Sequence, residues 1–139
     1  LGLQDRITAR LPPEESLPAV AQGALGIQCR SGDAGVEALI APLNDPASQI
    51  RVEAERALNR MLEGSCQIPI GAYAELHDDD RMLHLRGLVG SVDGATIVRG
   101  EIRGPAAEGA LLGQRLGRDL LDRGGRGILD RLLADEESS

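Results

Sequence analysis

Cys66 is the side chain best placed for covalent chemistry. It lies between Gly64 and Pro69, where a helical pattern ends and an alternating strand pattern begins, so we expect a loop there. A thiolate in an accessible loop could attack an electrophile and keep the covalent group. An ordinary loop cysteine is the simpler interpretation, because no base or cation adjoins it and the end of a helix disfavours a thiolate. From the residues alone, both interpretations stay open.

Gln22 and Gly23 are a second candidate site. Glycine lets the backbone approach a ligand closely, and the glutamine amide offers both donors and acceptors. A bulge before the apolar stretch 24–29 would explain the same pair by spacing alone. We predict that stretch to be a strand, with Cys29 as a small buried residue within it. Two cysteines without a secretory signal fit a reducing cytoplasm better than a disulfide framework.

Other polar clusters favour structural explanations. His77, His84 and the acidic residues 78–80 could suggest a metal site, but a charged hairpin turn accounts for them, so no metal site is predicted. Spaced glycines in residues 112–117 lie within a helical pattern and so do not form a phosphate loop. The acidic residues on the helices are expected to face solvent, and no Ser/His/Asp arrangement is found.

The clearest element is a helix over residues 46–63. Asp45 is its expected N-cap, Pro46 its first residue and Gly64 its stop. After Cys66 the apolar period changes from helical to alternating, which predicts strands over 68–76, 83–89 and 96–103. Turns are expected at 77–81 and at Asp93-Gly94. Two further helices follow, with leucines from 112 to 120 and from 129 to 133, interrupted by glycines 124–125, and residues 135–139 form an acidic tail.

The order of these elements predicts an α+β domain over residues 46–139, with a three-stranded antiparallel sheet covered by helices on one face. Residues 1–45 are expected to be incomplete by themselves. They contain a predicted short strand at 5–11, the strand at 24–29, and a helix capped near Asp33 with Val36 and Leu39 on its apolar face. No partner for these strands is evident in the sequence.

Composition narrows the function classes. The formal net charge is −7, and all 15 basic residues are arginine. An acidic chain repels a phosphate backbone, which argues against nucleic acid, although local arginine clusters can still bind small anions. No apolar run reaches the roughly 20 residues of a membrane span, and no signal peptide is visible. The core must be aliphatic, because Phe and Trp are absent and Tyr73 is the single tyrosine.

Three stretches carry a family resemblance. Residues 63–74 (EGSCQIPIGAYA) resemble the cofactor-attachment loop of porphobilinogen deaminases (hydroxymethylbilane synthases). Residues 17–30 (LPAVAQGALGIQCR) resemble a second segment of that family, and residues 51–59 (RVEAERALN) resemble the helix that leads into the loop. Order and spacing agree over essentially all 139 residues.

The resemblance implies a function. Cys66 would carry dipyrromethane through a thioether, and Gln22 and Gly23 would line the cleft near that cofactor. The family condenses four porphobilinogen molecules into hydroxymethylbilane with release of ammonia, as a cytoplasmic, monomeric transferase of tetrapyrrole and heme biosynthesis. Its catalytic aspartate and most substrate-binding arginines would lie upstream of Leu1, so no catalytic residue is assigned in this chain.

The same resemblance implies a domain division and a partner. Residues 1–45 would be the end of the second domain together with the strand and helix that return to the first, and 46–139 the cofactor-attachment domain. The upstream half of the same enzyme would then be the partner of residues 1–45, and the chain alone would be inactive.

Two other classes of protein are also compatible with this sequence. The order helix, three strands, helix also occurs in double-stranded-RNA-binding domains, although those need a basic face. A small binding or regulatory α+β module, in which Cys66 is incidental, is the remaining alternative.

Overall fold

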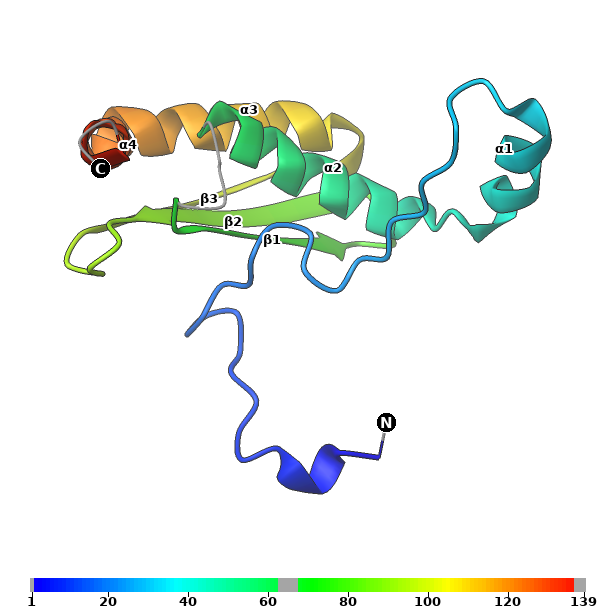
Figure 1. Ribbon diagram of the computed structural model, residues 1–139, viewed down its shortest axis with the longest axis horizontal. Helices are drawn as coiled ribbons and strands as arrows, with labels where there is room; N and C mark the ends of the chain where they lie inside the picture. The colour runs from blue at the N-terminus through cyan, green and yellow to red at the C-terminus, as the bar shows by residue number, and fades with distance from the viewer. Residues whose placement is uncertain (1, 63–67, 137–139) are drawn as a thin grey trace.

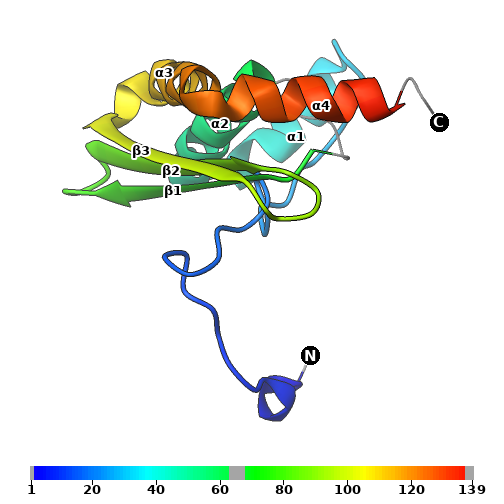
Figure 2. The same cartoon turned by 90° about the vertical axis from the view of Figure 1, so that its left-hand side faces the viewer.

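The computed structural model describes residues 2–62 and 68–136. Its central element is an antiparallel sheet in the order β1-β2-β3, with helices α2, α3 and α4 on one face and the N-terminal segment on the other (Figures 1 and 2). This arrangement confirms the predicted α+β class and the one-sided helical cover. The strands are β1 (Ile70–His77), β2 (Met82–Gly90) and β3 (Ile97–Pro105). The helical elements are η1 (Gln4–Arg6), α1 (Ala34–Ile40), η2 (Ala41–Leu43), α2 (Pro46–Met61), η3 (Ala106–Glu108), α3 (Gly109–Leu120), η4 (Leu121–Gly125) and α4 (Arg126–Glu136).

The helix starts follow the predicted capping residues. Asp45 accepts a hydrogen bond from the Ser48 backbone N–H at 2.7 Å, and Pro46 opens α2. Asp33 accepts from the Val36 N–H at 3.2 Å and caps α1. Each carboxylate satisfies an N–H that has no partner inside its helix. Both predicted caps are therefore confirmed.

The core lies between the sheet and the helices and is entirely aliphatic. Alternating residues of β1 and β2 face α2 and α3, as the period of two predicts. Among the described residues, no helix combines the length and the apolar character that crossing a bilayer requires. The largest fully buried side chains are Leu58, Leu62, Leu83, Leu85, Val89, Leu116 and Leu120.

Helices α2 and α3 approach each other closely because α3 presents a glycine every fourth residue. Gly109, Gly113 and Gly117 face α2 and are buried. A Cβ built on Gly113 would lie 2.3 Å from the Ala54 carbonyl oxygen, closer than any real contact. The backbones therefore touch directly, which supplies the packing that large side chains provide elsewhere. Gly113 and Gly117 are the spaced glycines that the sequence alone placed in a helical pattern.

Two strands predicted in the first 45 residues are absent. Residues 5–11 and 24–29 form no ladder, and Cys29 is half-buried outside any strand. A strand needs a neighbouring strand to pair with, and the described sheet consists of β1, β2 and β3 alone, so neither segment is paired. Apolar side chains in this region consequently face solvent, with Leu25 98% exposed and Leu39 78% exposed.

The break between α3 and α4 falls at the predicted glycines. Gly124 has φ 119° and ψ −7°, inside the kink labelled η4. Glycine adopts this conformation without strain, whereas a residue with a Cβ would be strained there. The interruption lets α4 fold back toward the sheet, where Ile128 and Leu129 join the core.

We expect Gly124→Ala to lower the free energy of unfolding by about 1–3 kcal/mol, because alanine is strained at this φ. Space is not the cause, since the nearest atom to the new Cβ, Val98 Cγ2, is 3.8 Å away. Urea unfolding measures the effect. Gly127→Ala is the matched control, because its Cβ meets nothing within 4 Å in regular helix. Gly127→Ala should raise the free energy of unfolding by about 0.5–1 kcal/mol. If both variants changed that free energy equally, backbone strain at residue 124 would not be the cause.

Candidate functional site

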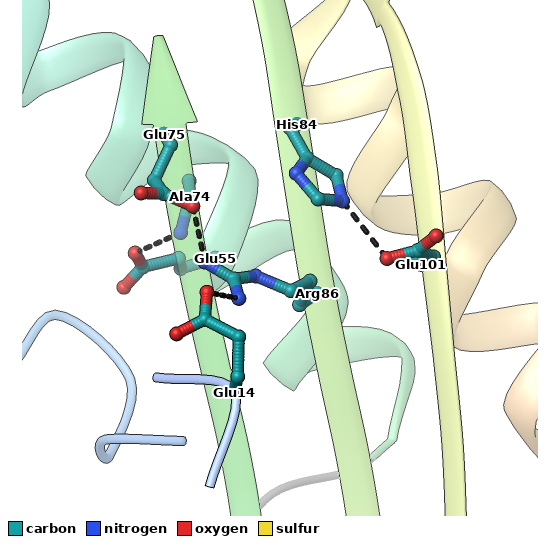
Figure 3. Close-up of polar contacts among 7 residues, drawn as sticks. All are labelled: Glu14, Glu55, Ala74, Glu75, His84, Arg86 and Glu101. Atoms are coloured by element: carbon teal, nitrogen blue, oxygen red, sulfur yellow. Dashed lines mark hydrogen bonds and ion pairs between the residues drawn. The ribbon is translucent and has the colours of Figure 1, made fainter. Parts of the chain in front are cut away.

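Segment 18–24, which carries Gln22 and Gly23, is held against the edge of β1 by one backbone hydrogen bond and by a carboxylate that bridges the two. Pro18 O accepts from the Ala72 N–H at 3.1 Å. The Glu55 carboxylate on α2 accepts from the Ala21 N–H at 2.7 Å and from the Ala74 N–H at 2.8 Å (Figure 3 shows the contact with Ala74). One side chain therefore joins three elements, namely α2, β1 and the segment before α1.

Glu55 was expected on a solvated helix face, and that prediction was wrong. The residue is 6% exposed, and its two oxygens satisfy amides that would otherwise lack partners. The spacing held a signal, since Glu55 precedes Leu58 by three residues and Leu62 by seven, and both leucines are buried. Burial raises the pKa of Glu55 above 4.5, while the two amide bonds and the charge of Arg51 oppose that rise.

Glu55 also holds a backbone turn of unusual conformation. Ala21 has φ 58°, in the left-handed region that non-glycine residues rarely adopt. Its N–H points at the carboxylate, so the bond to Glu55 offsets part of the strain. Gly23 follows with φ 85°, which glycine adopts without strain.

We expect Glu55→Gln to lower the free energy of unfolding by about 1–2 kcal/mol, because the new NH₂ group faces a backbone donor. In the wild type the raised pKa means that the native state binds more protons than the unfolded state above pH 4.5. The stability due to Glu55 is therefore complete below pH 4.5 and declines as the pH rises through the folded-state pKa. The difference between wild type and variant, measured by urea unfolding across pH, should shrink in that direction. Glu53→Gln, which makes the same change at an exposed position of the same helix, is the control and should leave the free energy of unfolding nearly unchanged.

Gln22 and Gly23 border a hollow between the segment and α2, as the ligand-approach hypothesis requires. The hollow measures about 260 Å³ and includes Arg51, Glu55 and Tyr73 in its lining. Gly23 also borders a second hollow, of about 690 Å³, that extends to η2. The amide oxygen of Gln22 is already used within the segment, because Oε1 accepts a hydrogen bond from the Ala19 N–H at 3.0 Å.

The smaller hollow does not fit dipyrromethane by itself. Each of the two rings of that group carries an acetate and a propionate, which call for arginine partners. The described lining offers one guanidinium, that of Arg51, beside the carboxyl group of Glu55. Cys66, the predicted attachment residue, lies outside the described residues, and the nearest described positions are the buried Leu62 and the half-buried Ile68.

A second polar group, which the sequence did not reveal, holds residue 14 to the open face of the sheet. Arg86 on β2 donates to Glu14 Oε1 at 2.6 Å and to Glu75 Oε2 (Figure 3). Its guanidinium carbon also lies 5.4 Å from the centre of the Tyr73 ring. The Arg86 guanidinium holds the pKa of Glu14 below 4.5. This open face carries acids beside its arginines, so it is not the basic surface of an RNA-binding domain.

The fold and these contacts define a helix-covered, open-faced α+β domain preceded by a segment docked on its edge strand. Comparison with protein families matches both parts. Residues 49–122 match the model described as "Porphobilinogen deaminase, C-terminal domain". Residues 1–38 match the model described as "Porphobilinogen deaminase, dipyromethane cofactor binding domain".

The chain belongs to the porphobilinogen deaminase family. The cofactor of the family is dipyrromethane, and the activity of the full enzyme is that of a transferase in tetrapyrrole biosynthesis, with porphobilinogen as its substrate.

Proposed function

We propose that this chain is the cofactor-carrying portion of a hydroxymethylbilane synthase. The observation that carries the proposal is the match of residues 49–122 to the family's C-terminal domain, since Cys66 lies within the matched range. The complete enzyme would condense four porphobilinogen molecules into hydroxymethylbilane and release ammonia at each condensation. Dipyrromethane would supply the covalent primer on which the product is built.

Cys66 is the proposed attachment residue. A thioether is a suitable anchor, because it resists hydrolysis over repeated turnovers. The thiol must be reduced before it can be alkylated, which supports a reducing compartment such as the cytoplasm. Gln22 and Gly23 are proposed to line the cleft beside the cofactor, supported by the hollow that they border.

Residues 1–45 are proposed to complete a cofactor-binding domain with the upstream half of the same enzyme, and residues 46–139 to form the attachment domain. The exposed apolar side chains of the first region, among them Leu25, Ile27 and Leu39, support a missing partner there. The single arginine in the lining of the smaller hollow supports a clamp for the substrate carboxylates that comes from elsewhere. On this proposal the chain alone makes no hydroxymethylbilane, and the assembled enzyme is a monomer.

The test is the intact mass of the chain, followed by peptide mapping, after assembly with an upstream half from the same family. We expect the peptide containing Cys66 to carry the added mass of two pyrrole units. An unmodified Cys66 in a preparation that converts porphobilinogen would overturn the attachment. Formation of hydroxymethylbilane by the isolated chain would contradict the proposal that catalysis requires the upstream half.

A further inference from the structure

The open face of the sheet brings together three metal-ligating side chains that lie apart in the sequence. Glu75 and His77 come from β1, and His84 comes from β2 directly opposite Glu75. One potential ligand atom from each of the three lies within 4.8 Å of the others. The two imidazole rings are 6.3 Å apart, tilted and not stacked. From the sequence, His77 and His84 could suggest a metal site, but a charged turn was the preferred explanation and no site was predicted, because the sequence does not give the strand register that aligns Glu75 with His84.

His84 is already oriented as a metal ligand would be. Its Nε2 lies 3.0 Å from Glu101 Oε2 on β3, and its side chain is only 10% exposed. In Figure 3 the other ring nitrogen, Nδ1, points toward β1, the strand that carries Glu75. A carboxylate on the far nitrogen fixes the tautomer and ring orientation of many metal-binding histidines. This pairing is independent of the clustering of the three donors.

We propose that Glu75, His77 and His84 form a binding site for a zinc-like divalent transition metal ion, with Glu101 as the carboxylate that positions His84. Two imidazoles and a carboxylate are a donor set that zinc accepts, with water in the remaining position. A tetrahedral zinc ion at about 2.0–2.2 Å holds its ligands roughly 3.3–3.6 Å apart. Donor atoms up to 4.8 Å apart must therefore approach by about 1.5 Å at most, through rotamer adjustments of the exposed His77 and the half-buried Glu75.

The surrounding charges are compatible with a cation. The turn beside the site carries three exposed aspartates at 78–80, and the chain as a whole has a net charge of −7. Arg86 engages Oε2 of Glu75, so a metal ion would take Oε1 and share the carboxylate. Arg103 is the cross-strand partner of His84, but its side chain is exposed and can extend into water. A bound ion would cross-link β1 and β2 next to their turn.

Zinc titration with a competing chromophoric chelator at pH 7.5 tests the proposal, with both thiols alkylated so that sulfur does not compete. We expect one zinc ion per chain at micromolar concentration. His77→Ala should weaken binding at least tenfold without unfolding the chain, because His77 is exposed. Glu101→Gln should weaken it about 10–100-fold, as a positioning residue does.

Asp80→Asn is the matched control, because it removes an exposed acid from the adjacent turn without removing a ligand. It should bind zinc like the wild type, and zinc should raise the melting temperature of both proteins but not that of His77→Ala. Equal affinity in His77→Ala and Asp80→Asn, or no saturable binding in the wild type, would overturn the site. Neither result bears on the pyrrole chemistry of Cys66, so failure here is distinct from failure of the proposed function.

Discussion

Replacing Cys66 with serine should abolish covalent attachment of the dipyrromethane group in the assembled enzyme. Serine has nearly the same size, but its hydroxyl is a far weaker nucleophile at neutral pH than a thiol. The variant should therefore fold, show the unmodified mass of the chain, and give no hydroxymethylbilane from porphobilinogen. Mass spectrometry of the peptide and an assay of the product measure the two effects separately.

Cys29→Ser is the matched control for that experiment. Cys29 is the other cysteine of the chain, and it lies half-buried outside the candidate site. This variant should keep the added pyrrole mass and the activity. If Cys66→Ser retained the mass while Cys29→Ser lost it, the assignment of the attachment residue would be wrong.

The second large effect concerns stability. Gly113→Ala should lower the free energy of unfolding by about 3 kcal/mol or more, because the new methyl group meets backbone atoms of α2 and not a flexible side chain. The Cβ would lie 2.3 Å from Ala54 O and 2.9 Å from Leu58 N. Alanine favours a helix by about 1 kcal/mol over glycine, which is too little to offset the separation of two packed helices.

Thermal and urea unfolding of Gly113→Ala measure this loss. Gly127→Ala again supplies the control, since it makes the same change in α4 with no atom near the new methyl group. A loss below about 1 kcal/mol in Gly113→Ala would mean that α2 and α3 can move apart easily, and would contradict the close contact described above.

Local signals in the sequence predicted most of residues 46–139 and also the start of α1 before them. The caps at Asp33 and Asp45 depend on a side chain and an amide three residues away, so the pattern contains the whole interaction. The alternation in β1 and β2 and the break at Gly124 are equally local.

The errors came from contacts between distant segments. The strand predicted at 24–29 needs a neighbouring strand, and the described sheet does not provide one. Glu55 looked like a surface acid because its partners, Ala21 and Ala74, lie 34 and 19 residues away. The site as a whole was only partly predictable, because the hollow beside Gln22 and the triad of Glu75, His77 and His84 exist only once the chain has folded.

The hydrogen bonds on β1 also bear on aggregation between copies of this protein. β1 is an edge strand, and open edge amides are templates on which another chain can add a strand. Pro18 and Glu55 occupy the outward amides of Ala72 and Ala74, so the middle of this edge is blocked to a strand from a second molecule. The segment that carries Gln22 and Gly23 thus covers part of this edge, and its detachment would open the Ala72 amide to a strand from another copy of the chain.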